Sequence, residues 1–167
     1  MIIREFLPEE LDVYLNHFND ERVTLHIPKR TRDERATIFS IAQNQYNDTN
    51  TRGIWGMFDV SSGAFIGSCL LRPFNEDQDI MELGYSIEQN YWSRGLGTEM
   101  AAAIIELGFT DPSVSEIVAV TTFDNLASQR VLEKAGLLRE GNLRRGDDEL
   151  AFFSLKREQV SKKINFK

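Results

Sequence analysis

The amino-acid sequence predicts a mixed α+β fold, with helices on both faces of one sheet. Apolar residues recur at helical spacing in some segments and alternate with polar residues in others, which indicates helices and half-buried strands. In chain order we expect a strand, two helices, three strands of antiparallel type, a helix, a strand, a helix and two strands. A length of 167 residues suits one domain, so residues 1–167 are expected to form a single domain.

The first half of the chain is expected to contain one strand, two helices and a hairpin. Turn chemistry at Ser61-Ser62-Gly63 separates the two hairpin strands. The segment between the helices contains Pro28 and is expected to be irregular. The expected ranges are 2–6 for the strand, 8–19 and 32–46 for the helices, 20–31 for the irregular segment, 47–53 for a polar break, and 54–60 and 64–71 for the hairpin.

An alternating strand opens the second half of the chain, because apolar and polar residues take turns from 81 to 87. Residues 117–122 form a continuous apolar run, as expected for a strand covered on both faces. Asn125 supplies capping chemistry for a helix that Gly136 ends, and the charged tail after Lys156 is expected to fray. The expected ranges are 80–87, 117–122, 137–144 and 149–155 for strands, and 99–109 for the helix before that of Asn125.

Composition and charge exclude several classes of protein. The net charge of −7 excludes the global positive field expected of a nucleic-acid-binding protein. No apolar run approaches the roughly 20 residues of a membrane span, and the first residues do not read as a signal peptide. Cys69 is the single cysteine, and the two histidines lie apart, so no disulfide or metal-ligand spacing arises. We expect a cytoplasmic protein with no metal, nucleic-acid or membrane partner.

A loop with two glycines, between the alternating strand and the next helix, is suited to binding phosphate. Gly95 and Gly97 let the backbone approach a ligand closely, and the first N–H groups of the helix lack intrahelical partners. Met100 stands where a dinucleotide fingerprint needs its third glycine, and no Gly-Lys-Ser/Thr ending marks a P-loop. The loop therefore fits pyrophosphate without fitting NAD or ATP; a simple tight turn is the alternative.

The sequence around this loop resembles the GNAT acetyltransferases, and within them the branch that includes the RimJ/RimL-type ribosomal-protein N-terminal acetyltransferases. The likeness covers nearly the whole chain in order. Trp92 stands where the general family pattern has Gln or Arg, as is usual in this branch. The motifs are Glu-Leu-Gly-Tyr-Ser-Ile at 82–87, Tyr-Trp-Ser-Arg-Gly-Leu-Gly-Thr-Glu at 91–99, Asn-Leu-Ala-Ser at 125–128, Leu-Glu-Lys-Ala-Gly-Leu at 132–137 and Asp-Glu-Leu-Ala-Phe-Phe-Ser-Leu at 148–155.

The resemblance implies a GNAT-like fold and acetyl-CoA as co-substrate. The implied sheet is mixed and mostly antiparallel, with about seven strands splayed at the cofactor site and about four helices on its faces. A strand end would pair with the pantetheine arm, a loop would hold the pyrophosphate, and an asparagine would lie near the thiol. These residues are Tyr85, Ser86 and Ile87 for the strand end, Trp92, Ser93, Arg94, Gly95, Leu96, Gly97 and Thr98 for the loop, and Asn125.

The resemblance also implies direct attack of a neutral amine on the thioester. Glu82 matches a carboxylate often used in the family as the base, here through a water; a structural carboxylate is the alternative. Many GNAT enzymes protonate the departing thiolate with a tyrosine, but Leu132 stands at that position. Ser128, one turn earlier, is the candidate donor, with helix capping as its alternative. His17, expected on the surface, and His26 are further candidate bases.

We therefore expect an N-acetyltransferase that moves an acetyl group from acetyl-CoA to a primary amine. The acceptor is an amine-bearing small molecule or a protein N-terminus, and the sequence does not choose between them because acceptor residues lie in variable loops. A non-catalytic acyl-CoA-binding or regulatory module on the same fold is the alternative, favoured by Leu132. A protein-interaction domain with a vestigial site is a third class. A homodimer is expected by analogy only.

Overall fold

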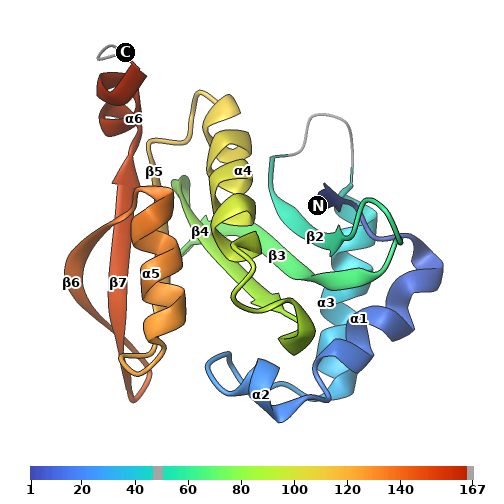
Figure 1. Cartoon of the computed structure of the whole chain (residues 1–167). Helices are drawn as coiled ribbons and strands as arrows, with labels where there is room; N and C mark the ends of the chain where they lie inside the picture. The colour runs from blue at the N-terminus through green and yellow to red at the C-terminus, as the bar shows by residue number, and fades with distance from the viewer. Residues whose placement is uncertain (47–50, 165–167) are drawn as a thin grey trace. The chain divides into compact units, whose positions relative to one another are not determined.

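The computed structural model describes residues 1–46 and 51–164 of the chain. Within these residues, seven strands form one sheet in the order β1-β2-β3-β4-β5-β7-β6 (Figure 1). β4 (Asp77–Ile87) runs parallel to β5 (Glu116–Thr121), whereas β7 (Asp148–Lys156) pairs antiparallel with β5. The expected mixed sheet is confirmed. Part of the predicted polar break, residues 47–50, lies outside the described residues.

The chain divides into two compact units. The first contains residues 1–70 and 85–96, and the second contains residues 71–84 and 97–167. Three elements contribute residues to both units, because the division falls inside them; they are β3 (Phe65–Phe74), β4 and α4 (Leu96–Thr110).

The first unit is built around a cluster of aromatic side chains. Phe6, Tyr14, Phe39 and Phe58 are all buried, and the ring centroids of Phe6 and Tyr14 lie 5.4 Å apart in an edge-to-face arrangement. The helices that carry Tyr14 and Phe39 lie side by side (Figure 1). The remaining elements of this unit are β1 (Ile2–Arg4), η1 (Pro8–Glu10), α1 (Leu11–His17), α2 (Glu21–Thr24), α3 (Arg32–Gln45), β2 (Gly53–Phe58) and η2 (Gln89–Tyr91).

The second unit is built around β5. Ile117, Val118 and Ala119 are consecutive and all buried, so both faces of β5 are covered, as its continuous apolar run predicted. β7 pairs with β5 on one side and with β6 (Leu138–Arg145) on the other. α5 (Leu126–Ala135) packs against β5 and β6, and it ends at Gly136, whose φ of +100° is left-handed as expected for a helix C-cap.

Two short helices occur where the sequence predicted irregular chain. α2 lies inside the segment 20–31, and the Asp20 side chain caps it by accepting a hydrogen bond from the Arg22 N–H at 2.9 Å. α6 (Arg157–Ile164) lies where a fraying tail was expected. The Arg157 side chain donates to the backbone oxygens of Val114 at 2.8 Å and Phe109 at 2.9 Å. These contacts are distant in sequence, which is why local pattern did not reveal the helix.

Candidate active site

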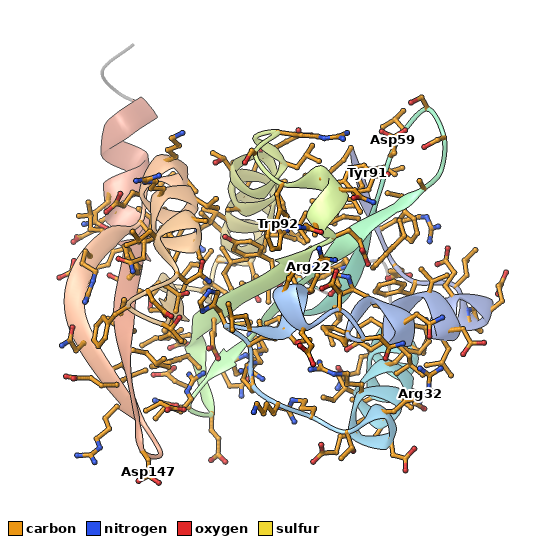
Figure 2. All side chains as sticks on the ribbon, turned by 60° about the horizontal axis from the view of Figure 1, so that its bottom comes forward. Arg22, Arg32, Asp59, Tyr91, Trp92 and Asp147 are labelled. Atoms are coloured by element: carbon orange, nitrogen blue, oxygen red, sulfur yellow. The ribbon has the colours of Figure 1, made fainter. Side chains whose placement is uncertain are left out.

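Side-chain contacts within the first unit hold the loop between β4 and α4. The indole Nε1 of Trp92 donates a hydrogen bond to the backbone oxygen of Ile87 at 2.7 Å, which ties the loop to the end of β4. The Arg94 guanidinium lies over the Tyr91 ring, 5.1 Å from its centroid. Tyr91 and Trp92 are labelled on this loop in Figure 2.

The same loop reaches α4 through residues with positive φ. Ser93 has a φ of +60° and Gly95 a φ of +80°, values that glycine adopts without strain. A Cβ on Gly95 would meet no atom within 4 Å, so backbone conformation rather than space favours glycine there. α4 begins at Leu96, directly after this turn, and the first N–H groups of a helix are donors suited to a phosphate.

β3 approaches the end of β4 closely at Gly67. A Cβ on Gly67 would overlap the backbone oxygen of Ser86 and lie 2.9 Å from the Cα of Ile87. The Glu88 N–H donates to the backbone oxygen of Ile66 at 2.7 Å. The absence of a side chain at Gly67 therefore allows Ser86 and Ile87 to lie where they do.

A hydrogen-bonded chain of side chains in the first unit was not predicted from the sequence. His17 at the end of α1 is only 2% exposed, so the expectation that it lies on the surface is wrong. Its Nδ1 lies 2.7 Å from Glu88 Oε1, and its Nε2 lies 2.7 Å from Ser86 Oγ. Ser68 Oγ lies 3.3 Å from Ser86 Oγ. The available signal was helical spacing, because His17 follows the buried Tyr14 by three residues and shares its face.

Glu82 lies in an ion-pair cluster of the second unit. Its Oε2 accepts hydrogen bonds from Arg72 Nε at 3.1 Å and Nη2 at 2.9 Å, and its Oε1 accepts from Arg145 Nη1 at 2.8 Å. The residue is 6% exposed, so these charge-assisted bonds replace most of its hydration. Both oxygens of the predicted base are thus bound by cations on β3 and β6. Its role as a base stays a prediction.

The predicted residues of α5 make a helix cap. Asn125 Oδ1 accepts a hydrogen bond from the backbone N–H of Ser128 at 3.1 Å. Asn125, and not the Ser128 side chain, therefore provides this cap. Leu132, one turn after Ser128, is 1% exposed and belongs to the core.

The predicted site residues fall in both units. Tyr85, Ser86, Ile87 and the loop from Trp92 to Leu96 belong to the first unit, whereas Glu82, Gly97, Thr98, Asn125 and Ser128 belong to the second. Across residues 1–46 and 51–164, no three His, Cys, Asp or Glu side chains are grouped so that they could hold a metal ion. In the same residues, every helix is too short or too polar to cross a membrane.

Comparison with known proteins places the chain in a family. Residues 1–138 match the family described as Acetyltransferase (GNAT) domain. The uncharacterized protein YkkB of Bacillus subtilis is 30% identical over 141 residues, which cover 83% of this chain and 81% of that protein. 

Solved structures share the fold. An aminoglycoside acetyltransferase in complex with coenzyme A and kanamycin has a TM-score of 0.78 at 19% identity, covering 97% of this chain and 98% of that one. Spermidine N-acetyltransferase from Vibrio cholerae, in complex with CoA and spermine, has a TM-score of 0.77 at 15% identity, covering 96% of this chain and 97% of that one. The family match and the shared fold agree: this chain belongs to the GNAT acetyltransferases and is an acyltransferase.

Proposed function

We propose that the protein transfers an acetyl group from acetyl-CoA to a primary amine of a small molecule. The observation that carries this proposal is the turn at Gly95 followed at once by the N-terminus of α4, in a chain that belongs to an acetyltransferase family. Two solved structures of the same fold contain coenzyme A with kanamycin or with spermine, small molecules that each carry several amino groups. The net charge of −7 suits a cationic acceptor of this kind.

For the donor, we propose that each predicted segment contacts a different part of acetyl-CoA. Backbone groups of Tyr85, Ser86 and Ile87 pair with the pantetheine arm. The loop from Trp92 to Thr98 holds the pyrophosphate with its N–H groups. Asn125 lies near the thiol end and donates from Nδ2, and Ser128 donates a hydrogen bond to the departing sulfur.

The branch of the family to which the chain is assigned bears on the identity of the acceptor. The resemblance to the RimJ/RimL-type enzymes would make the acceptor a protein N-terminus, whereas the kanamycin and spermine complexes favour a small molecule. We propose the small molecule, because both named ligands carry several amino groups and the chain is acidic. A peptide with a free N-terminus is therefore the informative competitor in any assay.

A second candidate function is a non-catalytic acyl-CoA-binding module. Leu132 favours it, because a buried leucine has no proton to give to a departing thiolate. Such a module would bind acetyl-CoA but would release no CoA in the presence of any amine.

One experiment separates these functions. Thermal unfolding is measured with acetyl-CoA, CoA, NAD or ATP, and CoA release is then measured with spermine, kanamycin and a peptide bearing a free N-terminus. At ~100 times its dissociation constant, a ligand stabilises by about 2.7 kcal/mol, a rise of roughly 5–10 °C for a chain of this size. We expect acetyl-CoA and CoA, but not NAD or ATP, to raise the unfolding temperature. We also expect turnover with spermine or kanamycin. Stabilisation without turnover would favour the binding module, and no stabilisation by acetyl-CoA would refute both.

A further inference from the structure

The side chains around His17 form an ordered chain from a carboxylate to a hydroxyl. We propose that Glu88, His17 and Ser86 are the relay that accepts the proton of the acceptor ammonium, an inference that rests on the proposed function. An ammonium has no lone pair, so a group near the reacting atoms must take its proton before attack. The distances of 2.7 Å on both sides of the imidazole are within proton-transfer reach.

Hydrogen-bond chemistry assigns the tautomer of His17. An ionised carboxylate only accepts, so the His17 Nδ1–H donates to Glu88 Oε1. Nε2 then carries the lone pair and accepts from the Ser86 hydroxyl. Ser68 Oγ, 3.3 Å away, can donate in turn to Ser86 Oγ. The two serine hydroxyls therefore donate toward His17 Nε2, and the Nδ1–H of the same ring is anchored by Glu88.

The surroundings of His17 keep the imidazole neutral and able to accept a proton. Burial lowers the pKa of His17, and the nearby Arg35 guanidinium lowers it further. The hydrogen bond and charge of Glu88 raise this pKa, as does the charge of Asp20. The Phe18 and Phe65 rings pack edge-on against the imidazole, with centroids at 4.8 and 5.3 Å, and exclude water from it.

Ser86 is the member that meets the substrate. It lies in the segment proposed to contact pantetheine, and it is 8% exposed, whereas His17 is 2% exposed. In the proposed step, an ammonium N–H bond breaks and its proton passes to Ser86 Oγ as the original hydroxyl proton passes to His17 Nε2. The products are a neutral amine, a serine hydroxyl and an imidazolium stabilised by Glu88.

The remaining steps balance without another reactant. The amine forms the C–N bond, the C–S bond breaks, and the second amine proton leaves with the thiolate as CoA thiol. The imidazolium returns its proton to Ser86 Oγ as the serine hydroxyl proton passes to water. Ser86 is thus a catalytic residue, whereas His17 and Glu88 act through it.

The test is a pH profile of the whole chain and its variants. With acetyl-CoA and spermine or kanamycin, kcat/KM of Ser86→Ala and His17→Asn is expected to fall about 100-fold or more, with little change in the KM for acetyl-CoA. For Glu88→Gln, kcat/KM is expected to fall about tenfold. The acid limb of its pH profile should move to lower pH, because Glu88 raises the pKa of His17. The matched control is Ser154→Ala, which deletes the hydroxyl of another buried serine, in β7.

A second readout does not require activity. The chain has two histidines, so in His26→Asn the remaining imidazole ¹⁵N signals belong to His17. We expect a protonated Nδ1 and an unprotonated Nε2 at neutral pH. The opposite tautomer of His17 would overturn the relay alone. The same conclusion would follow if Ser86→Ala and His17→Asn turned over as fast as an active wild-type protein. Absence of turnover by the wild-type protein with spermine, kanamycin or a peptide amine would instead overturn the proposed function and the relay together.

Discussion

Two glutamate-centred clusters in this molecule differ in the partner that holds the carboxylate, and the Glu82 carboxylate is buried whereas that of Glu88 is partly exposed. In the second unit, Glu82 accepts hydrogen bonds from two arginines, Arg72 and Arg145. In the first unit, Glu88 accepts a hydrogen bond from a histidine, His17. Arginine does not give up its proton in proteins, whereas histidine exchanges one near neutral pH.

The difference teaches how the same residue type serves different purposes. The Glu82 cluster holds fixed charges in place, because neither partner changes its protonation state. The Glu88 cluster orients an imidazole whose other nitrogen is bonded to a hydroxyl, the arrangement of a base and the group that orients it. Family resemblance predicted Glu82 as the base, whereas our proposal of a relay rests on the contacts of His17 in the other cluster.

The largest expected effect concerns the backbone beside Ser86. Gly67→Ala should cost about 2–3 kcal/mol of unfolding free energy and should abolish turnover, because its Cβ would displace Ser86 and Ile87. Chemical denaturation and CoA release measure the two effects. The control is Gly63→Ala, which has a φ of +69° but no atom within 4 Å of its Cβ, and which should cost about 1 kcal/mol without loss of turnover.

The next effect tests the Glu82 cluster. Glu82→Gln should lower the unfolding free energy by about 1–3 kcal/mol, because two arginines lose an ionised partner, while the acid limb of kcat/KM stays in place. Glu149→Gln, at an exposed position of β7, is the control and should change stability by less than about 0.5 kcal/mol. A loss of activity of more than about 100-fold at unchanged stability would instead make Glu82 the base.

The pH dependence of stability should reveal His17. Because its pKa is lowered in the folded protein from 6.5, the unfolded chain binds the proton more tightly. The stabilising contribution is therefore present above pH 6.5 and is lost as pH falls through the folded-state pKa, at no more than about 1.4 kcal/mol per pH unit. Urea denaturation from pH 7.5 to 5 measures the slope. His17→Asn should flatten it, whereas His26→Asn should leave it in place.

The smallest effect concerns the loop after the relay. Trp92→Phe removes the hydrogen bond to the Ile87 backbone oxygen. It should weaken the binding of acetyl-CoA by about 1 kcal/mol, which calorimetry would measure as a few-fold rise in Kd. Tyr91→Phe is the control, since it keeps the ring that lies under Arg94. Equal affinities of the two variants would mean that the Trp92 bond does not shape the donor site.

The sequence by itself determined the order of the main elements, because their signals are local. Alternation in β4, the apolar run of β5 and the Asn125 and Gly136 caps of α5 each depend on a few neighbouring residues. The glycine loop was found in the same way, and its positive φ at Gly95 follows from the residue type.

Only the tertiary structure decided which polar side chains meet. His17 and Ser86 are 69 positions apart, and Arg145 and Glu82 are 63 positions apart. No local periodicity carries such a pairing, because it depends on how strands and helices pack within each unit. Burial then sets the chemistry: it removes water from the His17 imidazole and lowers its pKa, whereas two cations bind the Glu82 carboxylate.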